Sequence, residues 1–169
     1  MILNCVPTRI SSGVLSFVLA ESSSCTFSLA TTIGRSMDEI LEELRALNAA
    51  GLSPLELPDE DDILEAESQL LVTLDGDYRD FLLTASDIVC GSLEPVTVAD
   101  QNLHTYLPEV AAVAWDRGLS REMLPLCEAG GGYYCVDMEG QVLFWKNGEF
   151  GEDVWEHIWE WAQDVWMVS

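Results

Sequence analysis

The spacing of apolar residues changes partway along the chain, and this change constrains the fold more than any other feature of the sequence. Between residues 38 and 117, apolar residues recur at the helical period along one side of each segment. Between residues 123 and 146 they form short runs bounded by turn sequences, which is typical of strands. Residues 153–166 return to the helical period. This order predicts an α+β domain, with a small antiparallel meander placed between helices.

The first region is expected to form helices over residues 38–48, 59–70, 77–85 and 103–117. Ser36 and Glu39 match a capping box for the first helix, and Gly51 is expected to end it. Asp59 is the expected N-cap of the second helix and Asp77 that of the third, because short acceptor side chains satisfy the free amide groups there. The residues expected to face the core are Ile40, Leu41, Leu44, Leu47, Ile63, Ala66, Leu70, Tyr78, Phe81, Leu82, Ala85, Leu107, Val110, Ala111, Ala114 and Trp115.

Short strands are expected at Met123–Cys127, Tyr133–Asp137 and Gln141–Lys146, with a further short candidate at Pro95–Ala99. Glu139-Gly140 is a turn sequence between the second and third strands, and Asn147-Gly148 turns the chain again. Asn-Gly favours the two-residue turns that reverse a strand. The strands are therefore expected to be antiparallel neighbours.

The last segment, Asp153–Trp166, is expected to be one amphipathic helix. Its apolar side holds Trp155, Ile158, Trp159, Ala162, Val165 and Trp166. Val154 and Trp161 flank this side, so one of the two is expected to be partly exposed.

Acidic residues far outnumber basic ones, with 30 against 7 and a formal net charge of −23. Residues 37–169 hold 29 of these acids and only five bases, a net charge of −24. Such a surface repels nucleic acid phosphates and anionic lipid, and it attracts basic proteins. We therefore expect a basic protein partner, with no nucleic acid and no membrane partner. Solubility is the alternative explanation of the charge.

Residues 1–36 differ in composition from the rest and contain Glu21 as their only acid. Their short apolar run, residues 13–20, follows Arg9 as in a weak signal-like segment. The alternative is a misassigned start, with Met37 as the true first residue. We therefore divide the chain into a non-homologous N-terminal extension, 1–36, and an α+β domain, 37–169.

The cysteine pattern indicates a reducing compartment. The chain has 5 cysteines, an odd number, and no C-x-x-C pair. It also has no run of 18 apolar residues, so we expect no membrane-spanning helix. A cytoplasmic location follows as the expectation.

No segment carries a recognisable chemical motif. The acids of Asp59–Asp62 and Asp75–Asp77 lack the glycine and glutamate positions of a calcium loop, and helix capping explains them. His104 and His157 are isolated and the cysteines are not clustered, so no zinc site is expected. No nucleophile-elbow motif occurs. We expect no catalytic, cofactor or metal site, and a protein that is not an enzyme.

Several segments carry a family resemblance. Leu57-Pro58-Asp59-Glu60, then Leu74–Leu82, then Leu124–Asp137 and Gln141–Trp145, occur before a Trp-rich end. In this order they resemble the SUKH superfamily, which contains the yeast Smi/Knr cell-wall regulators. The resemblance covers residues 37–169. It implies an α+β fold with a central, mostly antiparallel sheet flanked by helices.

The same resemblance implies a role. Many bacterial members of the superfamily look like immunity proteins that neutralise secreted toxins, often nucleases. A nuclease is basic because it holds a polyanion, so an acidic inhibitor is its physical complement. The alternative is an intracellular scaffold or regulatory adaptor without a toxin partner, as in the eukaryotic relatives. Gly76 and Ser86–Val89 depart from the family's pattern, which leaves the partner's identity open, and the oligomeric state is open too.

Aromatic anchors surrounded by charge are common in protein interfaces. We therefore expect the binding surface to combine acids near two helix starts with one or two exposed tryptophans. The residues predicted for this surface are Asp59, Glu60, Asp61, Asp62, Trp145, Glu149, Glu152, Asp153 and Trp161.

Overall fold

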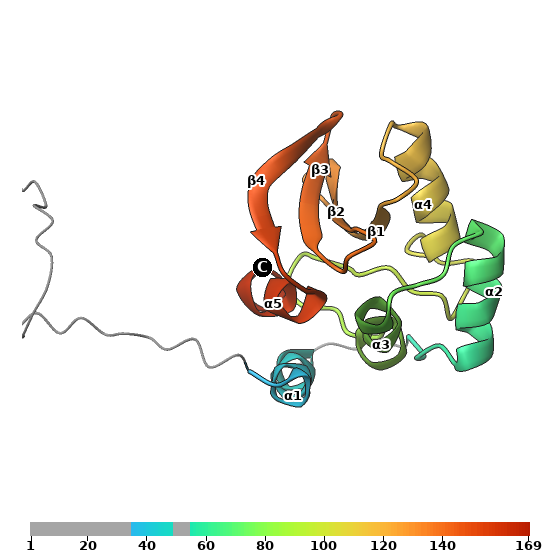
Figure 1. The fold of residues 1–169 in the computed structure, drawn as a ribbon. Helices are drawn as coiled ribbons and strands as arrows, with labels where there is room; N and C mark the ends of the chain where they lie inside the picture. The colour runs from blue at the N-terminus through green and yellow to red at the C-terminus, as the bar shows by residue number, and fades with distance from the viewer. Residues whose placement is uncertain (1–34, 49–54) are drawn as a thin grey trace, which may run out of the picture. The chain divides into compact units, whose positions relative to one another are not determined.

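The structure, a computed structural model, describes residues 35–48 and 55–169 (Figure 1). Its elements are α1 (Met37–Asn48), α2 (Glu60–Leu70), α3 (Gly76–Ala85), α4 (Leu107–Asp116), β1 (Leu124–Ala129), β2 (Gly132–Val136), β3 (Val142–Lys146), β4 (Glu149–Trp155), α5 (Ile158–Asp164) and the 3₁₀ helix η1 (Trp166–Val168). The predictions for residues 1–34 and for Gly51 lie outside the described residues.

The four strands form one antiparallel sheet in the order β1-β2-β3-β4. This confirms the predicted α+β fold with an antiparallel sheet and helices around it. Residues 95–98 lie along the outer edge of β1, where the Val96 N–H donates to the Leu126 carbonyl at 2.9 Å. The prediction of a short strand at Pro95–Ala99 is therefore wrong. The segment is held by single bridges at Pro95 and Thr97.

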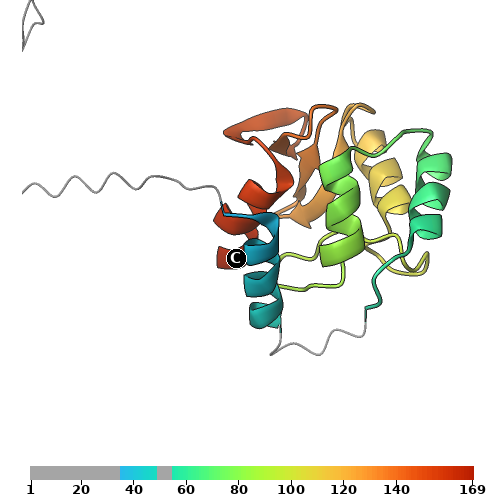
Figure 2. The same ribbon diagram turned by 60° about the horizontal axis from the view of Figure 1, so that its bottom comes forward.

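The helices cover the sheet on both faces. α5 lies against the sheet, with α1 and α3 beside it, and α2 lies beside α4 (Figure 2). Along β2, Tyr133 and Cys135 face α4 on one side, and Tyr134 faces the α5 side on the other. The Tyr78 hydroxyl, buried on α3, donates to the Pro125 carbonyl of β1 at 2.8 Å, so a hydrogen bond also joins α3 to the sheet.

The predicted core of the first three helices is confirmed with one exception. Ile40, Leu44 and every predicted residue of α2 and α3 are buried. Leu41 is half-buried. Leu47 is exposed, because it lies in the last turn of α1, beyond the part of the helix that packs on the core. Ser36 and Glu39 make the predicted reciprocal capping box.

Two helix starts differ from the prediction. Asp75, not Asp77, caps α3, because Asp75 has an extended backbone and its carboxylate accepts the Asp77 N–H at 3.1 Å. α4 begins at Leu107 rather than residue 103, since Tyr106 is extended and bridges to Thr97. Pro108 suits the first turn of such a helix because it lacks an N–H that would be unpaired there.

The prediction of one helix over residues 153–166 is wrong at its start. Asn147 and Gly148 both have positive φ angles, 53° and 89°, and form the tight turn that pairs Glu149 with Lys146. The chain therefore continues as β4 to Trp155, and α5 begins only at Ile158. His157 caps α5 by accepting the Glu160 N–H at 3.0 Å.

The N-terminus of α2 offers a test of this local structure. The Asp59 carboxylate accepts the Asp61 and Asp62 N–H groups at 2.9 and 3.0 Å, and the Asp62 carboxylate accepts the Asp59 N–H at 2.9 Å. We expect Asp59→Ala to lower the free energy of unfolding by about 1 kcal/mol more than Asp61→Ala, because both remove one negative charge but only the first removes the cap. Urea unfolding of the two variants measures the difference. Equal losses would contradict the capping role.

Candidate functional site

The negative charge of the surface is mostly uncompensated. In residues 35–48 and 55–169, the carboxylates that contact a cationic or histidine side chain are those of Glu43, Glu60, Glu67, Glu94 and Glu128. Arg79 accounts for two of these, since it contacts both Glu60 and Glu67. The remaining acids of this part of the chain make no ion pair with a basic side chain within it.

The predicted acids at the start of α2 stabilise the helix and its contact with α3. Asp59 and Asp62 form the reciprocal capping box, and Glu60 contacts Arg79. Asp59, Glu60 and Asp61 remain exposed, so a partner can reach them. Their role in binding stays a prediction.

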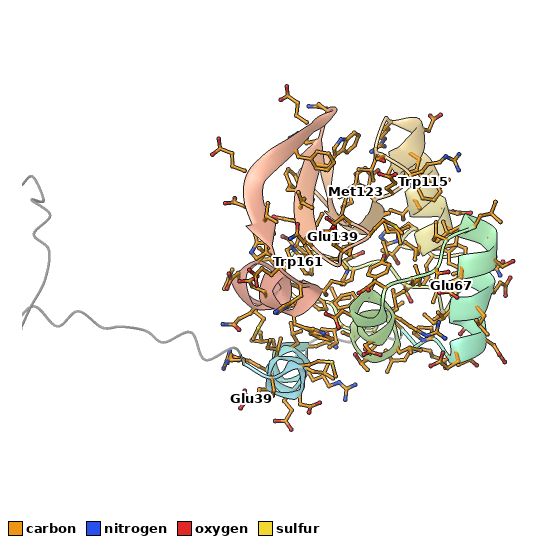
Figure 3. All side chains as sticks on the ribbon, viewed as in Figure 1. Glu39, Glu67, Trp115, Met123, Glu139 and Trp161 are labelled. Carbon is orange, nitrogen blue, oxygen red and sulfur yellow. The ribbon has the colours of Figure 1, made fainter. Side chains whose placement is uncertain are left out.

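The two predicted tryptophan anchors are buried, and this part of the prediction is wrong. Trp161 is 0% exposed and projects from α5 towards the sheet, with its ring 5.4 Å from that of Tyr134 (Figure 3). Trp145 is 4% exposed and stacks on Tyr133 at 6.3 Å. Both indoles fill the two layers of the core, so neither can enter a partner's pocket.

The predicted acids of the second group lie on a strand instead of at the start of a helix. Glu149, Glu152 and Asp153 belong to β4, and all of them are exposed. On the same strand Phe150 pairs with Trp145, and Val154 pairs with Leu143. Phe150 is 47% exposed and Val154 is 51% exposed. The sequence analysis expected either Val154 or Trp161 to be partly exposed, and Val154 is the one; it missed Phe150.

Phe150 borders a surface groove that we call the Phe150 groove. It has a volume of about 430 Å³ and is lined by Ser120, Glu122, Met123, Asp137, Met138, Glu139 and Phe150. Met138, in the β2–β3 turn, is 68% exposed. Every charged residue in the lining is acidic. A neighbouring hollow of about 230 Å³ shares Glu122, Asp137 and Met138 and reaches Asp75 at the start of α3.

This groove has the composition of a protein-binding site. Phe150 and Met138 supply exposed apolar surface, and three carboxylates stand around it. An apolar centre with a charged rim is the usual arrangement of such interfaces. The sequence signal for it was the Asn147-Gly148 turn, because a strand after that turn brings Phe150 beside Trp145.

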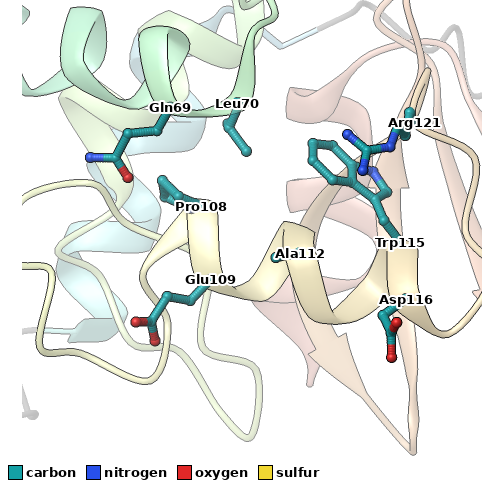
Figure 4. A pocket seen from close by; sticks show the side chains of 8 residues that line it. All are labelled: Gln69, Leu70, Pro108, Glu109, Ala112, Trp115, Asp116 and Arg121. Atoms are coloured by element: carbon teal, nitrogen blue, oxygen red, sulfur yellow. The ribbon is translucent and has the colours of Figure 1, made fainter.

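A second groove lies between α2 and α4 (Figure 4). It has a volume of about 700 Å³, and the Arg121 guanidinium lies 5.0 Å from the centre of the Trp115 ring in its wall. The Trp115 indole N–H donates to the Met123 carbonyl at 3.0 Å. One face of this aromatic ring is thus already occupied by a cation of the same chain, and Glu109 and Asp116 add opposite charges.

Both histidine rings, which could otherwise take part in catalysis or metal binding, contact groups of the same chain. The His104 ring contacts the Glu94 carboxylate at 2.9 Å, and His157 caps α5. Among residues 35–48 and 55–169, no three His, Cys, Asp or Glu side chains gather in a way that could hold a metal ion. No helix in the same part of the chain is long and apolar enough to cross a membrane.

The three described cysteines are free thiols in the core. Cys127 on β1 and Cys135 on β2 are fully buried. Burial raises the pKa of the Cys135 thiol to about 12. Burial, together with the neighbouring Cys135, raises the pKa of Cys127 further. A raised pKa keeps both thiols protonated at neutral pH, so they are poor nucleophiles.

Comparison with known proteins agrees with this architecture. A family model described as SMI1-KNR4 cell-wall (SUKH_5) matches residues 37–167. A crystal structure of a protein from Pseudomonas syringae pv. tomato is 51% identical, with a TM-score of 0.75. The match covers 79% of this chain and 100% of that one. A search of curated protein sequences found no match.

The buried thiols give a test of the core around the sheet. At pH 8 we expect iodoacetamide to modify Cys127 and Cys135 at least about 100-fold more slowly in the native protein than in urea, because their raised pKa leaves almost no thiolate. Mass spectrometry of the two cysteine-containing peptides measures both rates. Rapid modification without urea would contradict the buried positions.

Proposed function

The chain belongs to the SMI1-KNR4 cell-wall family, and from this membership we propose that it is an immunity protein that binds a basic toxin domain and blocks it. An immunity role is what the SUKH resemblance implies for a bacterial member. The uncompensated negative charge is the observation that carries the proposal, because a nuclease toxin needs a positive surface to hold its substrate.

Charge complementarity would act mainly before contact. An acidic surface of this density raises the association rate with a basic partner by about 10 to 1000-fold, and it penalises acidic partners. Residues 37–169 carry 29 acids against five bases. The partner class that this field selects is a basic protein domain, most simply a toxin of the nuclease type.

The contact itself would need an apolar centre as well as charge. The Phe150 groove supplies it, since Phe150 and Met138 lie among Glu122, Asp137 and Glu139. The carboxylates would occupy the cationic positions where the toxin holds phosphate groups, and the apolar side chains would exclude water from the contact. Inhibition then follows from occupancy, because the toxin cannot hold its substrate and the inhibitor in one cleft.

A cytoplasmic site of action is part of this proposal. The described cysteines, Cys90, Cys127 and Cys135, are all unpaired thiols, which suits a reducing compartment. A toxin that reaches the same compartment would meet its inhibitor there.

Capture of the partner tests the proposal. The full chain, immobilised and exposed to lysate and secretome of its source strain, is expected to retain one dominant basic protein domain that high salt releases. That domain should lose its toxic activity when the chain is added. Retention of an endogenous regulatory or cell-wall protein that the chain does not inhibit would contradict the immunity role and favour the adaptor alternative.

Charge removal at the groove provides a quantitative prediction. We expect the double variant Glu122→Gln with Glu139→Gln to slow association with the captured domain about 10-fold at low salt, because it removes two charges from the rim of the Phe150 groove. The control removes two exposed acids away from the groove, Glu42→Gln with Glu56→Gln. Surface plasmon resonance at low and high salt measures both rates. Equal association rates for the two variants would show that the groove is not the contact.

A further inference from the structure

β4 has an outer edge that no described segment covers. The strand order ends at β4, whereas the opposite edge of the sheet, at β1, is bordered by residues 95–98. An uncovered edge presents N–H and C=O groups that can pair with another chain. Within the described residues, no backbone hydrogen bond outside the sheet involves Glu149–Trp155.

The register shows which residues of β4 point to this edge. The tight turn at Asn147-Gly148 makes Lys146 and Glu149 the hydrogen-bonded pair that closes the hairpin. Hydrogen-bonded and non-bonded pairs alternate along antiparallel strands, so Trp145 and Phe150 form a non-bonded pair. The backbone N–H and C=O of Phe150 therefore point away from β3.

The pairing of β3 with β2 shows that the backbone groups of Val154 also point away from β3. The Asp137 N–H donates to the Gln141 carbonyl at 3.0 Å, which sets the phase of the β2–β3 ladder. In this phase Leu143 directs its backbone groups to β2 rather than to β4. Val154, which lies opposite Leu143 after the irregularity in β4, therefore also directs its N–H and C=O to the free edge.

Phe150 and Val154 thus each offer a partner both free backbone hydrogen-bonding groups and an exposed apolar side chain. Their backbone groups face the free edge, and their half-exposed side chains lie on one face of the sheet, next to Leu143 and Trp145. A strand added beside β4 would form main-chain hydrogen bonds at both residues. It would also place alternate side chains against the two apolar ones.

The negative charge around this edge favours a basic segment as the strand that could pair with β4. β4 itself carries Glu149, Glu152 and Asp153, and the rim of the Phe150 groove adds further carboxylates. Lys146 lies opposite Glu149 on the neighbouring strand, and its ammonium group donates to the Gly130 carbonyl at 2.8 Å. A second copy of this chain would set these acids against each other, because like charges opposite one another destabilise a strand pair. A strand with Lys or Arg at alternate positions meets no such penalty.

We propose that β4 accepts an extended basic segment of the partner as a fifth strand, with alternating apolar and Lys or Arg residues. This inference deepens the proposed function and rests on it, because it names the chemistry of the segment that docks. The apolar residues of the segment lie over Phe150 and Val154, and its backbone pairs with theirs. The acids of β4 have a second effect, since they keep this edge from joining its own copy.

A peptide test examines this docking without the natural partner. The probe is an acetylated ten-residue peptide of alternating Lys and Val, added to the full chain and followed by fluorescence anisotropy. Amide hydrogen exchange, measured by NMR, is expected to slow at Phe150 and Val154 when the peptide is bound. Binding without protection of these two amides would overturn the proposal, because charge alone would then explain it.

Two variants at one position separate backbone pairing from side-chain contact. Val154→Ala keeps the outward N–H and is expected to weaken peptide binding no more than about 3-fold. Val154→Pro removes that N–H without removing a bond to β3, and it is expected to weaken binding at least about 10-fold. Circular dichroism establishes that both variants are folded. If Val154→Pro does not fold, exchange at Phe150 and Val154 in the unchanged chain decides the matter.

The same variants distinguish failure of the docking inference from failure of the proposed function. A captured toxin that binds Val154→Pro as tightly as the unchanged chain would overturn strand addition and leave the immunity role standing. Protected amides with the peptide, but no toxin captured, would support the edge as a docking site and contradict the immunity role. Protection that grows with protein concentration alone would identify a second copy as the occupant and overturn the proposal.

Discussion

The packing of α5 against the sheet depends on Trp161. The burial of this indole also determines which side chains are left for the surface. Its ring stacks on Trp166 at 6.0 Å and meets Tyr134 of β2 at 5.4 Å, while Trp166 in turn lies 5.7 Å from Phe81 of α3. These contacts join the sheet, the C-terminal helices and α3 into one core. Because the largest aromatic residues are used there, the protein surface is left to carboxylates and a few smaller apolar side chains.

Two of the exposed apolar side chains, Phe150 and Val154, lie on β4, where the cover of the sheet ends, whereas others such as Leu64 and Val113 lie on the helices. On the α4 side, Tyr133 and Trp145 pack against Leu119 and Met123, but β4 extends beyond this cover. Phe150 and Val154 continue the same face into solvent, beside the acids of the Phe150 groove. The arrangement places an apolar centre, a free strand edge and negative charge within one part of the surface. An inhibitor of a basic protein needs this combination, because charge guides the encounter and apolar contact holds it.

Much of the fold was predictable from apolar spacing. α2 and α3 show three or four buried residues on one side, and their predicted faces are confirmed residue by residue. The strands β1 to β3 were found because turn residues bound them on both sides. β4 was missed because Val154 and Trp155 fit the helical spacing of the residues that follow, so the two periods overlap at that point. The Asn147-Gly148 turn was the signal that should have decided for a strand.

The candidate site was less predictable, for a related reason. Exposure of a tryptophan depends on which layer covers it, and periodicity within one segment does not contain that information. Trp145 is covered by α4 and residues 119–123, and Trp161 packs on Tyr134 of the sheet. In both cases the cover comes from a distant part of the chain. The acids were correctly expected on the surface, since ionised carboxylates stay in water unless paired. The acids that line the Phe150 groove, Glu122, Asp137 and Glu139, were not among the predicted site residues, because their position beside Phe150 depends on the register of β3 and β4.

Hydrogen exchange of the full chain, with and without its captured partner, tests the central claim most directly. The claim is that a basic protein binds through β4 and the Phe150 groove. We expect slower exchange in Glu149–Trp155 and in residues 120–122 and 137–139 on binding, while α1 stays unchanged. Protection centred on α1, or on the groove between α2 and α4, with β4 exchanging as in the free protein, would contradict the account.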